Sequence, residues 1–179
     1  MVAGFDHIVP KGLDHILFVI GLFLLSVRLG PLLWQVTSFT IAHSITLALG
    51  ALGLVSISPD VVEPLIAASI VFVALENLAT DRLKPWRPAL VFGFGLLHGL
   101  GFASVLAEFG MPNAHFLTAL VAFNVGVELG QFAVVAACYG LVGYWFGRRP
   151  WYRRAVVWPA SLGIAAVAAF WFLERVGVI

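Results

Sequence analysis

Long apolar runs, separated by short polar segments, fill almost the whole of this sequence. Six of them are long enough for a membrane-spanning helix, which needs about 20 apolar residues. They cover residues 12–29, 33–57, 62–80, 89–109, 116–146 and 156–173. The runs are too long for transmembrane barrel strands and lack the alternation that such strands need. The pattern predicts an all-α fold, a polytopic bundle of six transmembrane helices.

These runs leave little of the chain for anything else. With 179 residues, the sequence is expected to form one transmembrane domain over residues 1–179. Residues 1–11 are expected to form a short interfacial or pre-helix segment. They lack the basic n-region of a cleavable signal peptide.

The composition agrees with a bilayer as the solvent. Hydrophobic residues make up 61% and charged residues 11%, whereas about a quarter of a typical soluble domain is charged. This excludes a soluble enzyme and a disordered segment. A net charge of +1 offers no basic field for nucleic acid. The single cysteine, Cys138, excludes an intrachain disulfide and a CxxC metal site.

Basic residues predict the orientation of the six spans. Those on one side are Arg28, Arg82, Lys84, Arg87, Arg148, Arg149, Arg153 and Arg154. The other side has only Lys11 and Arg175. By the positive-inside rule the first side is cytoplasmic, so both termini face the outer, periplasmic side. We expect a multi-pass protein of a bacterial-type inner membrane.

Ionisable residues inside apolar spans are candidates for function, because a charge near the bilayer centre costs at least a few kcal/mol. The candidates form a ladder with His7, Asp14 and His15 near the outer face, His43, His98 and Glu128 near the midplane, and Glu76 near the inner face. Three further polar residues are expected to support them: Asn124, Gln131 and Thr46. Glu108 and His115 flank the outer loop between the fourth and fifth spans.

Each candidate also has a structural interpretation. A lone histidine in a membrane helix often makes only a helix–helix hydrogen bond. Asp14 could cap the first span at its positive end, and Glu76 could snorkel or pair with Arg82. Asn124 and Gln131 could be packing contacts.

Two helical hairpins look alike in sequence. The second and third spans supply His43 and Glu76, and the fourth and fifth supply His98 and Glu128 in similar surroundings. Internal repeats with a site at their interface are common in transporters. Both a true duplication and a chance match of apolar sequence explain the likeness.

Imidazole and carboxylate together favour a divalent metal ion. This ligand set suits nickel, cobalt, zinc or iron, whereas the lack of thiolates and the two methionines argue against copper(I). Protons compete with metal for such ligands. We therefore expect no permanent cofactor, and a divalent ion as the bound or transported ligand.

Five stretches of the sequence resemble the HupE/UreJ family, and within it the shorter UreJ-like branch. They are GLDHILFVIGL (residues 12–22), FTIAHSITLALGALGL (39–54), IVFVALENL (70–78), FGFGLLHGLGFA (92–103) and FNVGVELGQ (123–131). The resemblance implies secondary transport of nickel or cobalt, with Asp14, His15, His43, His98 and Glu128 at family motif positions. The family's His-Pro pair before Gly-x-Asp-His is absent, since His7 and Pro10 are separated. Another metal or an accessory role therefore stays open.

The leading hypothesis is a proton-coupled secondary transporter of a divalent transition metal, and not an enzyme. The expected partners are the lipid bilayer and the ion, together with a second copy of the chain or a metalloenzyme maturation partner. A second hypothesis is a membrane metal-binding or accessory protein that does not transport. A third, an intramembrane metalloenzyme or haem protein, is disfavoured because the sequence has neither an HExxH pair nor clustered histidine boxes.

Overall fold

The structure is a computed structural model that describes the backbone of residues 1–108 and 116–179. Among these residues there are helices and short connections and no strand, which confirms the predicted all-α class. The predicted end of the fourth span at residue 109 and His115 lie outside the described residues, as does the side chain of Glu108.

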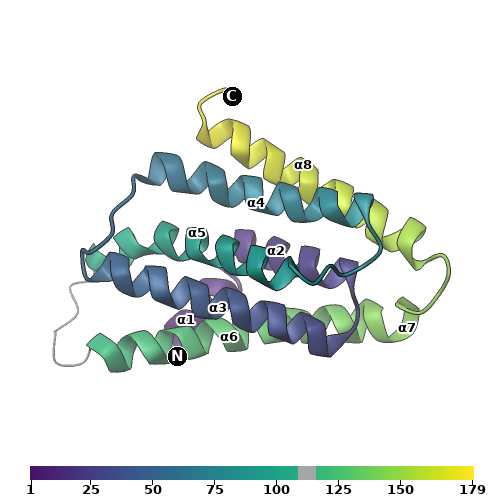
Figure 1. Cartoon of the computed structure of the whole chain (residues 1–179), viewed down its shortest axis with the longest axis horizontal. Helices are drawn as coiled ribbons and strands as arrows, with labels where there is room; N and C mark the ends of the chain where they lie inside the picture. The colour runs from purple at the N-terminus through teal and green to yellow at the C-terminus, as the bar shows by residue number, and fades with distance from the viewer. Residues whose placement is uncertain (109–115) are drawn as a thin grey trace.

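The helices follow the predicted runs (Figure 1), except that the run predicted at 33–57 is a helix over Leu29–Ala51 and therefore includes Gly30 and Pro31. Their bounds are α1 Val2–Ile8, α2 Leu13–Leu25, α3 Leu29–Ala51, α4 Pro59–Ala79, α5 Arg87–Glu108, α6 Phe116–Cys138, η2 Tyr139–Gly143, α7 Tyr144–Phe146, η3 Arg153–Val157 and α8 Trp158–Arg175. The start of α4 shows why the breaks fall where they do. The Ser58 hydroxyl accepts the Asp60 N–H, and Pro59 stands at the first helical position, where its missing N–H costs nothing.

The expected number of six spans is not confirmed. Within the described residues, four helical segments are long and apolar enough to cross a membrane: Leu29–Ala51, Pro59–Ala79, Phe116–Phe146 and Arg153–Arg175. A fifth is counted if α1 and α2, which are bent by 70° to one another, form one broken span. The 13 residues of α2 reach only about 20 Å, less than the hydrocarbon thickness of about 30 Å.

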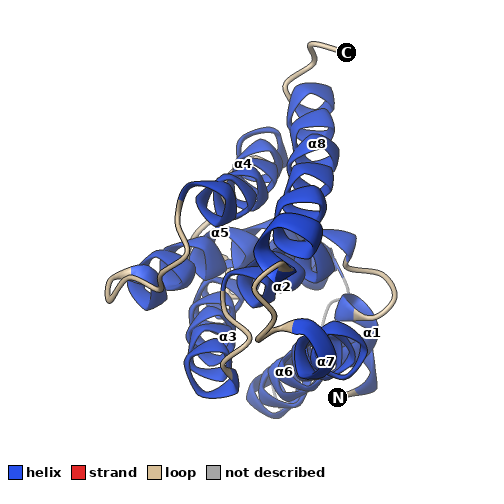
Figure 2. Ribbon diagram, turned by 90° about the vertical axis from the view of Figure 1, so that its right-hand side faces the viewer, coloured by secondary structure: helices blue, strands red, loops and turns tan. Residues whose placement is uncertain are grey.

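Helix α3 lies at the middle of the bundle. It packs along α5 on one side and along α6 on the other, while α4 covers α5. The outermost helices extend this row, with α8 against α4 and α1 against α6 (Figure 2). The short helix α2 contacts α3, α4 and α6. Its His15 also lies against His98 of α5, so α2 is surrounded by these four helices.

The connections that carry the basic residues gather at one end of the bundle. Figure 1 shows the α2–α3, α4–α5 and α7–η3 connections together on the right, and the C-terminal end of α8 at the opposite end. This grouping agrees with the predicted topology. Which end is cytoplasmic stays a prediction.

Candidate metal centre

Four histidines from four helices meet inside the bundle: His7 of α1, His15 of α2, His43 of α3 and His98 of α5. The centroid of the His15 ring lies 4.9 Å from the ring centroids of His7 and His98 and 5.6 Å from the ring centroid of His43. His15, His43 and His98 are at most 3% exposed. The sequence placed them at two levels of a ladder, whereas the structure joins the levels into one cluster.

The potential ligand atoms fall into two groups, each of which could hold one ion. They form two triads that share His15, one with His7 and His43 and the other with Asp14 and His98. Within each triad the ligand atoms lie within 4.8 Å of one another. Metal–ligand bonds of about 2.1 Å place the ligands of a tetrahedral ion about 3.4 Å apart, so the side chains of a triad must approach one another further to hold an ion.

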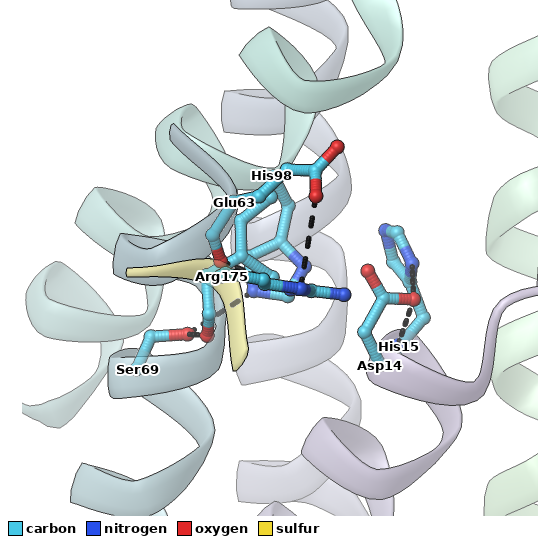
Figure 3. Close-up of polar contacts among 7 residues, drawn as sticks. Asp14, His15, Glu63, Ser69, His98 and Arg175 are labelled. Atoms are coloured by element: carbon cyan, nitrogen blue, oxygen red, sulfur yellow. Dashed lines mark hydrogen bonds and ion pairs between the residues drawn. The ribbon is translucent and has the colours of Figure 1, made fainter. Parts of the chain in front are cut away.

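The proton on His15 is fixed by its neighbour. Asp14 Oδ1 lies 3.0 Å from His15 Nδ1 and also accepts the backbone N–H of His15 at 2.8 Å (Figure 3). Because a carboxylate only accepts, a neutral His15 must carry its proton on Nδ1. Its Nε2 lone pair is then available for a metal ion. Histidine–carboxylate pairs of this kind orient metal ligands in many proteins.

His98 is held in the opposite tautomer. Its Nε2 lies 3.1 Å from Ser69 Oγ (Figure 3). When the Ser69 hydroxyl donates its proton to the Ile66 carbonyl at 2.7 Å, it accepts from His98 Nε2–H. The Nδ1 atom of a neutral His98 therefore carries the lone pair.

His43 is oriented by an amide. Asn124 on α6 donates its Nδ2–H to the Leu120 carbonyl at 2.9 Å, which leaves its Oδ1 to face His43 Nδ1 at 3.4 Å. A neutral His43 therefore donates from Nδ1 and keeps the lone pair on Nε2. The contact is of the kind expected of a supporting residue, and that role of Asn124 stays a prediction.

The three imidazoles thus hold lone pairs that nothing satisfies. Within the described part of the chain, His15 Nε2, His43 Nε2 and His98 Nδ1 are buried and have no hydrogen-bond partner. Buried polar atoms are normally satisfied, and one without a partner is a candidate ligand for an ion or a water molecule. Two such acceptors belong to each triad, His15 and His43 in one and His15 and His98 in the other, and imidazole nitrogens of this kind suit a borderline divalent cation.

Close helix packing brings these side chains together. Gly99 of α5 lies against the His43 carbonyl of α3, and Gly95 lies one turn away against the Phe39 carbonyl. A methyl group at either position would overlap these backbone atoms. Small residues four apart are typical of membrane helices whose backbones approach closely.

Aromatic rings pack around the cluster. Phe39 lies 5.0 Å from the ring of His98 and 5.7 Å from that of His15, and Phe18 lies 5.3 Å from His98. Both phenylalanines are fully buried. Charge–dipole interactions are stronger in such a low-dielectric setting than in water.

Glu128 and Gln131 lie outside this cluster. Glu128 Oε1 accepts a hydrogen bond of 2.6 Å from Thr37, and Gln131 Oε1 accepts one of 2.8 Å from Thr40. These bonds join α6 to α3. The predicted polar face of α6 is therefore present, but only Asn124 connects it to a histidine. Thr46, the other expected supporting residue, donates to the Leu96 carbonyl of α5 at 2.8 Å.

Glu76 also lies away from the histidines. Its Oε2 is 3.3 Å from Nε of Arg87, and the two side chains are only 9% and 1% exposed. This buried ion pair joins the end of α4 to the start of α5. Sequence reasoning placed Arg87 in a loop as an orientation signal and weighed Arg82 as the partner of Glu76. Arg82 instead faces Asp81 at 4.0 Å at the surface.

Two contributors were not identified from the sequence. Ser69 gives no signal, because one serine in an apolar helix is common. Arg87 could have been recognised from the Pro88 that follows it, since proline favours the first turn of a helix and places Arg87 at its start.

Comparisons with known proteins add one finding. A family model described as HupE / UreJ protein matches residues 1–175. No curated protein and no solved structure matches the chain.

Proposed function

The chain belongs to the HupE/UreJ family, and on that premise we propose that it is a secondary transporter of a divalent transition metal ion, nickel or cobalt first. The observation that carries the proposal is the set of three orphaned imidazole lone pairs on His15, His43 and His98. The association of the family with nickel and cobalt transport supports the choice of metal.

The shared ligand His15 suggests how an ion moves within the centre. The triad with His7 and His43 and the triad with Asp14 and His98 both use it. An ion can therefore exchange ligands one at a time without leaving imidazole. Several weak overlapping sites favour passage over tight retention, as in ion pores.

The seam between α4 and α5 is the proposed inward route. Along α4, Ser69, Phe72 and Glu76 follow one face by their i, i+3 and i+7 spacing. They meet His98, Phe94 and Arg87 of α5 in the same order. Glu76, once separated from Arg87, would take the ion or a proton at the inner end.

Proton coupling follows from the chemistry of the centre. A proton and a metal ion compete for each lone pair, so protonation of His15, His43 or His98 would release the ion. Glu128 lies between α3 and α6. We propose that its carboxylate takes up or releases the proton that is exchanged for the metal ion.

Uptake into proteoliposomes tests the proposal. We expect Ni²⁺ or Co²⁺ to enter vesicles that contain the protein, measured with an enclosed metal-sensitive dye, and His98→Ala to lower the rate about tenfold or more. Ser38→Ala is the matched control, because Ser38 is half-buried and its hydroxyl donates to the Trp34 carbonyl of its own helix. Equal rates for wild type and His98→Ala would contradict the site. Metal binding without flux would favour the non-transporting accessory role.

A further inference from the structure

A separate pocket opens at the end of the bundle where the basic connections gather. Its volume is about 450 Å³. It lies between the α2–α3 connection, the α4–α5 connection and the start of η3. None of the cluster histidines lines it, so it is independent of the metal centre.

Three guanidinium groups line this pocket against one carboxylate. They belong to Arg28, Arg82 and Arg153, and the carboxylate is that of Asp81. Asp81 and Arg82 are 71% and 91% exposed and 4.0 Å apart, so the pair is weak in water and leaves Arg82 able to turn. The pocket therefore has an excess of positive charge.

Arg153 has a fixed position in the wall. Its Nη1 donates to the Thr80 carbonyl at 2.8 Å and its Nη2 to the Leu78 carbonyl at 3.2 Å. These are carbonyls at the end of α4 that lack a helical partner. The arginine thus stays charged beside the pocket without needing an acidic partner.

The deeper wall is apolar and contains one polar group. Leu24, Leu25 and Val157 are buried and line the pocket together with Tyr152. The Tyr152 hydroxyl is buried and has no hydrogen-bond partner in the described part of the chain. Burial raises the pKa of Tyr152 to about 12, so its hydroxyl keeps its proton and can donate to an anion.

We propose that this pocket binds a phosphate group, carried by an anionic phospholipid or by a soluble phosphate, with Arg28 and Arg82 as the movable contacts. Arginine binds phosphate through paired N–H donors. The apolar wall below these donors fits the glycerol and upper acyl region of a lipid better than it fits a small hydrated anion. Such basic pockets between membrane helices are known to hold lipid headgroups.

Native mass spectrometry of the full-length protein in detergent micelles tests the proposal. The probes are phosphatidylglycerol, phosphatidylcholine and inorganic phosphate, each titrated separately. We expect phosphatidylglycerol to bind, and the double variant Arg28→Gln/Arg82→Gln to weaken it on the order of tenfold. The matched control is Arg148→Gln/Arg149→Gln, which removes the same charge at the same end of the bundle from residues outside the pocket lining.

The outcomes separate the sources. Binding of phosphatidylglycerol that is lost only in the pocket variant supports a lipid site, and the same pattern with inorganic phosphate supports a soluble ligand. Equal losses in the two double variants would show general electrostatic attraction and overturn the proposal. Absence of binding by both anionic probes would overturn it as well.

Discussion

At the residue scale, each imidazole of the cluster owes its orientation to a different neighbour. Asp14, Ser69 and Asn124 accept one N–H each from His15, His98 and His43. Every acceptor lies on the far side of its ring from the orphaned nitrogen. These three acceptors therefore decide which nitrogen of each ring keeps its lone pair, as such partners do in many metal sites.

Loss of one such acceptor should weaken metal binding. In Ser69→Ala, His98 Nε2–H has no acceptor and the ring can adopt the other tautomer. We expect the affinity for Ni²⁺ or Co²⁺ to fall about 10-fold to 100-fold, measured by isothermal titration calorimetry in detergent. Ser38→Ala should bind like the wild type. Unchanged affinity in Ser69→Ala would show that Ser69 does not set the tautomer.

The pair of Glu76 and Arg87 allows a second test at this scale. Removing one partner of a buried ion pair costs about 3 kcal/mol or more, whereas replacing both with apolar residues is often neutral. We expect Glu76→Leu to lower the free energy of unfolding by about 3 kcal/mol, and Glu76→Leu/Arg87→Met to recover most of it. Unfolding in mixed micelles measures both. A double variant no more stable than Glu76→Leu would contradict a mutual pairing.

At the element scale, the contact between α3 and α5 fixes the distance between His43 and His98. Gly99 permits this contact because its missing side chain leaves room for the His43 carbonyl and the Thr46 hydroxyl. Thr46 adds a hydrogen bond across the same interface. The two helices therefore act as one support for the metal centre.

Enlarging Gly99 should separate these helices. In Gly99→Ala the new methyl group overlaps backbone atoms that cannot rotate away. We expect a loss of about 1–3 kcal/mol in the free energy of unfolding, together with weaker metal binding. Gly93→Ala on the same helix is the control, since a methyl group there meets no described atom within 4 Å. The interface argument fails if both variants unfold alike.

The elements were largely predictable from sequence, and their tilt and depth were not. Apolar runs identify membrane helices because lipid leaves the backbone no other way to satisfy its polar groups. The histidines were recognisable because polar side chains are rare inside such apolar runs. Their meeting point depends on how α1 and α2 fold back into the bundle, where Gly4 rests on the Phe123 backbone. Hydropathy contains no information about such long-range packing, so Asp14 and His15 were expected at a separate outer level.

At the scale of the whole molecule, the two hairpins exchange partners. His43 of the first hairpin is bonded to Asn124 of the second, and His98 of the second to Ser69 of the first. The two glutamates also contact the other hairpin: Glu76 pairs with Arg87 of α5, and Glu128 accepts a hydrogen bond from Thr37 of α3. In this arrangement each hairpin holds the histidine of the other. This places the histidines at the interface of the halves, where transporters of repeated architecture bind substrate.

The most direct test of the metal centre is an anomalous-difference map from crystals of the Co²⁺-loaded protein, recorded at the cobalt absorption edge. The account predicts one dominant peak within bonding distance of His15 Nε2 and of at least one of His43 Nε2 and His98 Nδ1. Its height should fall in crystals of Ser69→Ala soaked at the same concentration. A dominant peak at Glu128 or Glu76, or density between the histidines with no anomalous signal, would contradict it.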